Sequence, residues 1–276
     1  MNLVISGSSG LIGRTLNQIA SSDFNIINLN RKMMNVENMR EISKQIDGGY
    51  VFLHLAWPVS KENYLYSKDN IDFLNQSKEL MQLLGDDVNC KRIIGVGSIL
   101  EHGNIQDVTD NSPLNPESTY AESKVNLANF LRLSHGDKSK WIRIGYQISA
   151  HDPRRKLVPV LLANSSYPNP LKTPYKFLDL IHRFDVAEAI LAFIKNCSAI
   201  EGFNALIATG RGIALYEFAN EFLEIKIPPS EQFEFYQTTN PQILKTLGWS
   251  AGYLTIKELT QIIYRERADF NFVPES

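Results

Sequence analysis

The fold of this chain is decided by Leu3-Val4-Ile5-Ser6-Gly7-Ser8-Ser9-Gly10-Leu11-Ile12-Gly13, a run that is apolar, then small, then apolar again. This order predicts a strand, a tight turn and a helix. Gly7 would allow the sharp turn, Gly10 would let backbone approach a phosphate, and Gly13 would let the helix pack closely on the strand. The start of the helix would offer free N–H groups and the positive end of its dipole. The stretch predicts a turn that holds the pyrophosphate of a dinucleotide.

We expect this turn to contact the cofactor through Gly7, Ser8, Ser9, Gly10, Leu11, Ile12 and Gly13. The alternative is a glycine-rich connection that binds nothing. The position of the glycine-rich turn favours dinucleotide binding, because the turn joins the first strand of the chain to a helix that a second strand follows.

The composition is that of an ordinary globular protein, with 43% hydrophobic and 21% charged residues among 276. A formal net charge of -2 provides no basic field for nucleic acid or anionic membranes. No run approaches the roughly 20 apolar residues of a membrane span, and the first strand begins too early to leave room for a signal peptide. We therefore expect a cytoplasmic protein. Cys90 and Cys197 are too few for a disulfide framework and suggest buried thiols, and no metal site is expected.

Strands and helices alternate along the chain, which is typical of a parallel sheet covered by helices on both faces. We expect strands near residues 3–5, 24–29, 50–56, 91–98, 141–144, 177–181 and 203–207. We expect helices after Gly10 and over about 36–46, 63–84, 119–134 and 185–195, with further helices near Leu215, Pro241 and Thr255. The fold class is α/β, with a doubly wound, mostly parallel sheet of the Rossmann type. Residues 33–49 leave room for only one helix, where another strand would usually fit.

A Pro-rich region over 151–176 interrupts this alternation and marks the place for a substrate lobe. We expect residues 1–150, continued by 177–210, to form the cofactor-binding core. Residues 151–176 and 211–276 would form a small, interleaved substrate-binding lobe.

The end of the second strand, Asn30-Arg31-Lys32, falls where a dinucleotide fold meets the adenosine ribose. A carboxylate there would bind the 2′-hydroxyl and repel a 2′-phosphate, whereas these residues offer neutral and cationic donors. This favours NADP(H), with NAD(H) also possible. The alternative is that Arg31 and Lys32 are solvated charges on a loop.

A tyrosine followed four residues later by a lysine occurs three times, as Tyr64 with Lys68, Tyr120 with Lys124 and Tyr253 with Lys257. Only Tyr120 opens the helix that follows the strand ending at Ser98, and ligands of open α/β sheets bind at such strand ends. We therefore expect Ser98, Tyr120 and Lys124 to be catalytic, and the other two pairs to lie on helix faces.

These residue types suit the reduction of a carbonyl. The substrate needs a proton donor, and a phenol with an ordinary pKa of about 10 must become more acidic to act near neutrality. Lys124 would lower the pKa of Tyr120 electrostatically and also reach the nicotinamide ribose. Ser98 would hydrogen-bond the oxygen on which negative charge develops, although a serine at a strand end can also have no role.

The order of the motifs along the sequence resembles that of the extended short-chain dehydrogenase/reductase family of NAD-dependent epimerases, dehydratases and nucleotide-sugar reductases. The resemblance rests on the G-x-x-G-x-x-G turn, His54-Leu55-Ala56, Gly97-Ser98 and Tyr120-x-x-x-Lys124, and it continues through residues 177–187, 202–210 and Leu247-Gly248-Trp249. It implies that Leu55, Ala56 and Trp57 contact the cofactor and that the substrate is a nucleotide-diphosphate sugar. It also leaves room for a homodimer.

Four departures limit what the resemblance implies. Ile99 and Leu100 follow Ser98, where dehydratases of the family have an Asp-Glu pair, so dehydration is disfavoured. Leu178 stands where many members have an arginine for the substrate pyrophosphate, and Tyr146 stands about where an asparagine often contacts substrate. The short span after Lys32 lacks the segment that usually supplies an adenine-contacting aspartate.

The leading hypothesis is an NADP(H)-dependent reductase of a nucleotide-diphosphate 4-keto sugar. A carbonyl reductase of another small substrate and a nucleotide-sugar epimerase with retained NAD are the enzyme alternatives. A cofactor-sensing protein without turnover is the alternative from another class, and it is disfavoured because Ser98, Tyr120 and Lys124 are all present.

Overall fold

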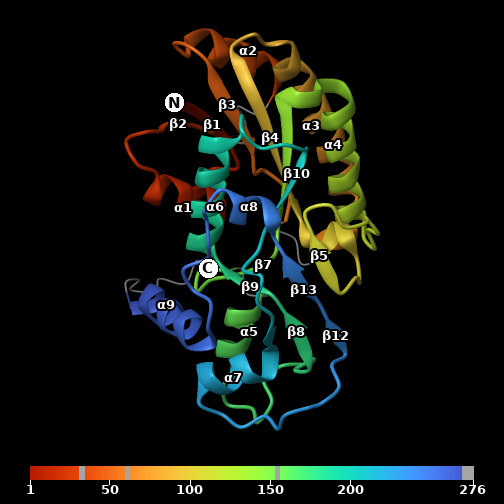
Figure 1. Ribbon diagram of the computed structural model, residues 1–276, viewed down its shortest axis with the longest axis vertical. Helices are drawn as coiled ribbons and strands as arrows, with labels where there is room; N and C mark the ends of the chain where they lie inside the picture. The colour runs from red at the N-terminus through yellow and green to blue at the C-terminus, as the bar shows by residue number, and fades with distance from the viewer. Residues whose placement is uncertain (31–34, 60–62, 153–155, 269–276) are drawn as a thin grey trace.

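The structure is a computed structural model that describes residues 1–30, 35–59, 63–152 and 156–268 (Figure 1). Its main sheet has six parallel strands in the order β10-β6-β4-β3-β1-β2. The strands are β1 (Asn2–Ser6), β2 (Asn25–Leu29), β3 (Tyr50–His54), β4 (Cys90–Ser98), β6 (Ser139–Ile144) and β10 (Asn204–Ile207). The α/β class and the doubly wound sheet are thus confirmed.

The order in which the chain adds strands to the sheet reverses at β1. From β1 the chain adds β2 on one side and then returns to add β3, β4, β6 and β10 on the other. The crevice at such a reversal is where open α/β sheets bind ligands. As the short span after the second strand predicts, α2 (Val36–Gln45) is the helix between β2 and β3, and the sheet ends at β2 in the described part of the chain.

Helices cover both faces of the sheet, as Figure 1 shows. The contacting pair α1 (Leu11–Ile19) and α6 (Arg183–Asn196) covers one face, and α2, α3 (Asp69–Asp86) and α4 (Thr119–His135) cover the other. Alternate strand residues point to opposite faces, so Leu3 and Ile5 join the α6 side while Val4 and Phe52 join the α3 side. Full burial of each such side chain contributes about 1.5–3 kcal/mol. No helix in the described ranges is both long and apolar enough to cross a membrane.

The lower part of Figure 1 is a smaller lobe with its own apolar core. It contains α5 (Leu157–Ala163), α7 (Leu215–Leu223), α9 (Ile256–Ala268) and a sheet of β11 (Ile213–Ala214), β8 (Lys176–Leu178) and β12 (Phe235–Tyr236). Two small parallel sheets join distant segments, β7 (Tyr146–Ile148) with β9 (Leu180–His182) and β5 (Asp107–Thr109) with β13 (Thr238–Asn240). The chain therefore passes repeatedly between core and lobe. The proposed domain limits stay a prediction. Residues 176–178, most of which were expected in the core, pair with other strands of the lobe sheet.

Several elements differ from expectation. The strand expected over 177–181 is split at Asp179, because this buried carboxylate accepts hydrogen bonds from Thr209, Gly210 and Thr239 and separates β8 from β9. Between β4 and α4 the chain also forms the 3-10 turn η3 (Ile99–His102) and the short strand β5. The short helix expected near Pro241 is α8 (Gln242–Thr246), and a 3-10 turn, η4 (Gly136–Lys138), follows α4.

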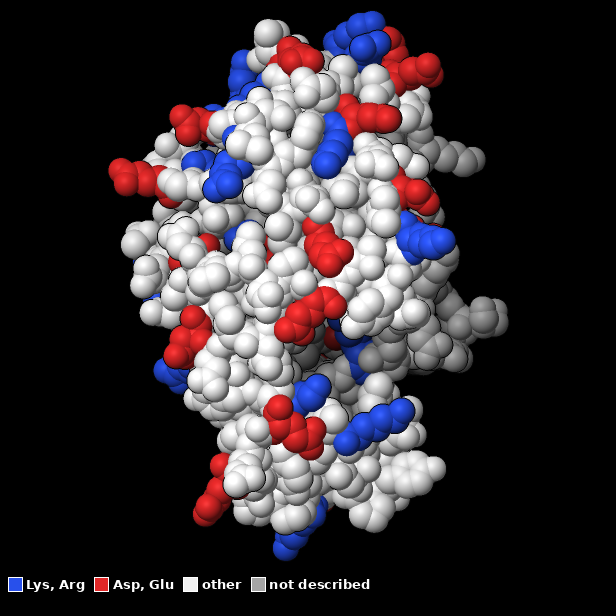
Figure 2. Space-filling model, turned by 90° about the vertical axis from the view of Figure 1, so that its right-hand side faces the viewer, with Lys and Arg blue, Asp and Glu red and all other residues white. Residues whose placement is uncertain are grey.

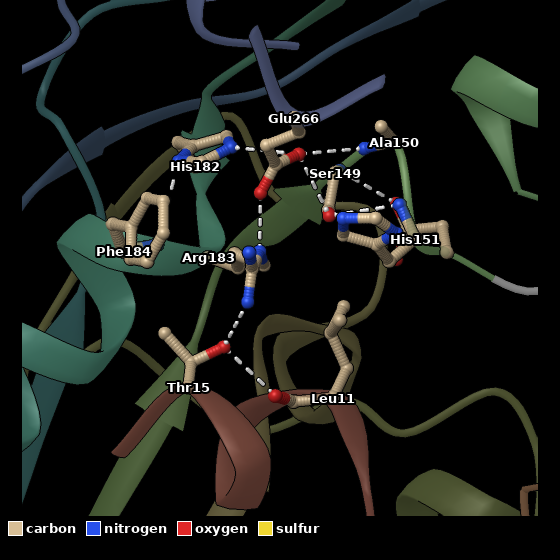
Figure 3. A network of polar contacts seen from close by, with 10 residues as sticks. Leu11, Thr15, Ser149, Ala150, His151, His182, Arg183, Phe184 and Glu266 are labelled. Atoms are coloured by element: carbon tan, nitrogen blue, oxygen red, sulfur yellow. Dashed lines mark hydrogen bonds and ion pairs between the residues drawn. The ribbon is translucent and has the colours of Figure 1, made fainter. Parts of the chain in front are cut away.

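A buried polar network ties α9 to the first residues of α6 and to α1 (Figure 3). Glu266 accepts hydrogen bonds from Arg183 Nε, from Ser149 Oγ at 3.0 Å and from the Ala150 N–H at 2.9 Å. The other arm of Arg183 donates to Thr15 Oγ1 on α1 at 2.8 Å. Burial acts to raise the pKa of Glu266, but contacts with His182 and Arg183 outweigh it and lower that pKa to about 2. Helix α9 of the lobe is therefore tied to α1 through one carboxylate.

Candidate active site

The glycine turn between β1 and α1 is formed as expected. Gly7 has a φ of +76°, and a Cβ built on it would lie 2.6 Å from the Ala56 backbone nitrogen. A Cβ on Gly13 would lie 2.5 Å from the Gly7 carbonyl oxygen. A side chain is thus excluded at Gly7 by the backbone conformation and by the close approach of Ala56. At Gly13 it is excluded by the packing of the helix against the turn. The turn is pressed directly against the segment that follows β3.

Gly10 forms the N-cap of α1 and contributes no side-chain cap, and no acidic residue lies in the first turn of the helix. The first N–H groups of a helix have no partner within it, so this end can bind an anion. On the outer side of Gly10 a Cβ would meet only the Gly7 carbonyl oxygen, at 3.2 Å. An exposed helix start without a side-chain cap fits the pyrophosphate of a nicotinamide dinucleotide.

The other expected cofactor residues that the structure describes lie around this turn. Ser8 Oγ donates to the Leu29 carbonyl at 3.4 Å, and the Ser9 carbonyl accepts from Arg14. The Leu55 N–H donates to the Ser6 carbonyl at 3.1 Å, which holds the Leu55-Ala56-Trp57 segment beside the turn. Leu11 and Ile12 begin α1, and Asn30 directly follows β2, while Arg31 and Lys32 lie outside the described residues.

Ser98 ends β4 and begins η3. Its hydroxyl accepts a hydrogen bond from the Leu100 N–H at 3.2 Å, and its own N–H donates to Glu101 Oε1 at 2.8 Å. This reciprocal arrangement is a capping box. It fixes the serine hydroxyl at the carboxyl edge of the sheet.

Tyr120 lies in the first turn of α4, which Ser118 caps through a 3.2 Å bond from the Ala121 N–H. Burial, then nearby Tyr64 and Glu101, raise the pKa of Tyr120, and the nearby Ser98 side chain opposes them. The structure thus brings Ser98 and Tyr120 together, but the expected acidification of the phenol is wrong, since burial dominates.

Lys124, one turn further along α4, is only 2% exposed. Its Nζ donates to the Val96 carbonyl at 2.7 Å and lies 3.8 Å from the centre of the Trp57 ring. It is 5.9 Å from the centre of the Tyr120 ring. Burial lowers the pKa of Lys124 to about 7, and the charge of Glu101 opposes this shift. The three residues expected to be catalytic therefore converge beside the segment that follows β3.

Glu101 is part of this site, although the sequence interpretation did not single it out. It is fully buried and accepts hydrogen bonds from Arg143 Nε at 2.7 Å and Trp141 Nε1 at 3.1 Å, besides the Ser98 N–H. Burial raises the pKa of Glu101, and the Arg143 charge opposes it. The spacing S-x-x-E, which is typical of a capping box, was the available signal.

Tyr64 also belongs to the site, so its expected place on a helix face is wrong. The helix expected from residue 63 begins at Asp69, because Asn70 Nδ2 donates to the carbonyls of Tyr64 and Ser67 and holds the 3-10 turn η2 (Tyr64–Tyr66). The Tyr64 ring thereby contacts that of Tyr120. Tyr253 precedes α9 and packs 5.2 Å from the His182 ring, so it too is not on a helix face.

A cleft of about 280 Å³ lies between core and lobe, where Figure 2 shows the surface hollowed. Its walls include Leu100, Ser118 and Tyr146 from the core side and Lys176, Leu178 and Phe235 from the lobe. Tyr146 and Leu178, two of the departures from the family pattern, thus both face it. Among the described lining residues, Lys176 is the one cation and Glu117 the one acid.

No model of a protein family matches the chain, and no curated protein matches it. Solved structures do. A UDP-glucose 4-epimerase has a TM-score of 0.77 and 16% identity, with 100% of each chain covered. A dTDP-glucose 4,6-dehydratase from Bacillus anthracis, in complex with NAD, has a TM-score of 0.75 and 16% identity over 98% of this chain and 97% of the other.

A dTDP-4-dehydrorhamnose reductase from Clostridium acetobutylicum has a TM-score of 0.74 and 14% identity over 97% of this chain and 100% of the other. At these identities the similarity shows the fold, and it spans nearly the whole chain. The chain has the fold of the extended short-chain dehydrogenase/reductase family.

Proposed function

We propose that this protein is an NADP(H)-dependent oxidoreductase that reduces a keto group through Ser98, Tyr120 and Lys124. One observation carries the proposal: the three side chains converge at the carboxyl edge of the sheet, beside the segment against which the glycine turn is pressed. If the turn holds the pyrophosphate of a dinucleotide, the nicotinamide of that dinucleotide and a substrate carbonyl in the adjacent cleft would meet at these three side chains.

The cofactor, when bound, supplies a hydride to the carbonyl carbon. The N-terminus of α1 and the glycine turn would hold its pyrophosphate. Ser98 hydrogen-bonds the carbonyl oxygen, and Tyr120 donates its phenolic proton to that oxygen as negative charge develops. Lys124, when protonated, would place a positive charge 5.9 Å from the centre of the Tyr120 ring.

The protonated phenol of Tyr120 agrees with the donor role that a reduction requires. Burial raises the pKa of Tyr120, so the phenol keeps its proton at ordinary pH and can give it to an alkoxide. The same burial disfavours a tyrosinate that would remove a proton from a substrate hydroxyl. Glu101 is already occupied by Arg143, Trp141 and Ser98, which suits a role in orienting Ser98.

A nucleotide-diphosphate 4-keto sugar is the proposed substrate. Proteins of this fold with such substrates include the dehydrorhamnose reductase, and the cleft between core and lobe opens next to Tyr146 and Ser118. A nucleotide-free carbonyl compound is the second candidate. It is favoured by Leu178, which lines the cleft where the family pattern has an arginine, and by Lys176 as the one cation among the described lining residues.

NADP(H) is the proposed cofactor because Asn30 is followed by Arg31 and Lys32 in the sequence and no carboxylate stands at that place. The cationic pair would attract a 2′-phosphate. NAD(H) remains the alternative cofactor, and protein that purifies with NAD(H) firmly bound would favour the epimerase.

The test has two steps. NADPH and NADH are first titrated by fluorescence, and single-turnover NADPH oxidation is then followed with nucleotide-linked keto sugars and with nucleotide-free carbonyl compounds. Tyr120→Phe is expected to keep cofactor binding and slow oxidation roughly 10²–10⁴-fold, the usual effect of losing a general acid. Lys124→Ala should reduce both turnover and cofactor affinity, and Ser98→Ala mainly turnover. Oxidation by Tyr120→Phe at the parent rate would exclude the mechanism, and failure of both cofactors to bind would exclude the function.

A further inference from the structure

Lys124 is a buried cation whose charge the fold does not balance with a carboxylate. None of the described ion pairs includes it, and the nearby Glu101 is bonded to Arg143 and Trp141. The direct contacts of its ammonium are the Val96 carbonyl at 2.7 Å and the face of Trp57 at 3.8 Å. A cation over an indole face is attracted by the quadrupole of the ring, and most strongly when water is excluded.

The indole of Trp57 is held in this position from several sides. Its Nε1 donates to Asn70 Oδ1 at 2.8 Å, and Asn70 is fully buried. The ring of Phe73 meets it edge-on at 5.2 Å, and that of Tyr120 at 6.2 Å. Trp57 thus contacts both members of the Tyr120–Lys124 pair.

The other titratable groups around Lys124 do not replace this contact. Glu101 from η3 attracts the ammonium but is shared with three donors. His54 from β3 stays neutral, because burial, and then the charge of Lys124, lower its pKa to about 3. Tyr120 on the same helix keeps its proton, because burial raises its pKa.

We propose that Trp57 is a positioning residue that keeps Lys124 protonated and in place through its indole face. Its catalytic consequence rests on the proposed function, since only a charged Lys124 can assist Tyr120. Loss of the indole face would lower the proton affinity of Lys124 and move the alkaline limb of the reduction rate to lower pH. The contact itself is independent of turnover and can be measured without a substrate.

The experiment is an NMR titration of the whole protein labelled with [ε-¹³C]lysine, with the Lys124 resonance assigned by Lys124→Arg. Trp57→Leu keeps the site apolar but removes the π face, so the titration midpoint of Lys124 should fall by about one pH unit, a roughly tenfold loss of proton affinity. Trp249→Leu is the matched control, since Trp249 packs on the other face of the sheet, and it should leave the midpoint unchanged.

Trp57→Phe keeps a smaller ring and should give a shift of the same sign and smaller size, and this variant decides the matter if Trp57→Leu does not fold. A midpoint that is the same in the Trp57 variant and the parent overturns the proposal, as does an equal fall in Trp249→Leu. A protein that shows the shift but oxidises no NADPH would keep this inference and remove the proposed function, so the two failures are distinguishable.

Discussion

Tyr64 lies edge-on against Tyr120, with ring centroids 5.3 Å apart and ring planes at 78°. The contact joins a 3-10 turn to the residue expected to donate the proton. It exists because Asn70 Nδ2 donates to the Tyr64 carbonyl and holds the turn, so that α3 begins only after it, at Asp69. The next two residues of that turn, Leu65 and Tyr66, line the cleft. One short turn thus contacts Tyr120 and also lines the cleft between core and lobe.

Tyr64→Ala is expected to lower turnover about 2–10-fold, because an aromatic pair contributes about 0.5–1.5 kcal/mol beyond its buried area. Tyr64→Phe keeps the ring and should leave turnover nearly intact. Tyr253→Phe and Tyr253→Ala are the controls, since Tyr253 packs on His182. The measurement is single-turnover NADPH oxidation. Parent-like rates in Tyr64→Ala would show that the ring does not support Tyr120.

Gly7→Ala should strongly weaken dinucleotide binding, because its Cβ would lie 2.6 Å from the Ala56 nitrogen and displace the turn. Gly48→Ala is a matched control: Gly48 has a similar φ of +77°, but a Cβ there meets nothing within 4 Å. Both variants carry the cost of a left-handed alanine, about 1–2 kcal/mol, in the free energy of unfolding. Cofactor titrations should separate them. Equal cofactor affinity in the two variants would mean that the turn is not the binding site.

Arg31→Asp should weaken NADPH binding by about 1.5–3 kcal/mol while affecting NADH much less, because it replaces a charge-assisted phosphate contact with repulsion. Arg31 lies outside the described residues, so this prediction rests on the sequence. The dissociation constants of both cofactors are compared in parent and variant. An equal loss for NADPH and NADH would contradict the proposed cofactor preference.

Glu266→Ala should lower the free energy of unfolding by roughly 3–5 kcal/mol, because it leaves Arg183 buried without its carboxylate. Asp23→Ala breaks the exposed pair with Lys195 and should lower the free energy of unfolding far less, because solvent screens this pair. Urea unfolding monitored by circular dichroism compares the two. Similar losses would show that the network of Figure 3 adds nothing beyond a surface pair.

The same carboxylate makes a pH-dependent contribution. The pKa of Glu266 falls from 4.5 to about 2 on folding, so its stabilisation is complete above pH 4.5 and is lost as the pH falls toward 2. The parent should therefore lose more stability over this range than Glu266→Gln, which has no proton to gain. Parallel pH profiles would contradict this assignment.

The strands of the main sheet, the sheet type and the glycine turn could be predicted from the sequence, because they depend on local signals: apolar periodicity and glycine spacing. The sequence also selected Tyr120 among three candidate tyrosines, since chain order places that residue after the Ser98 strand. The missing strand after β2 was readable from length alone. All of these features are set by residues close together in the chain.

Which residues surround Tyr120 and Lys124 became clear only from the tertiary structure. Trp57, Tyr64 and Glu101 reach them from three separate segments, and side-chain contacts at long sequence separation leave no periodic signal. The protonation of the site was decided in the same way: local spacing predicts that Lys124 acidifies Tyr120, but the depth of burial, a property of the whole fold, raises the pKa of the phenol instead. The split of the strand at Asp179 depends likewise on donors some 30 and 60 residues away.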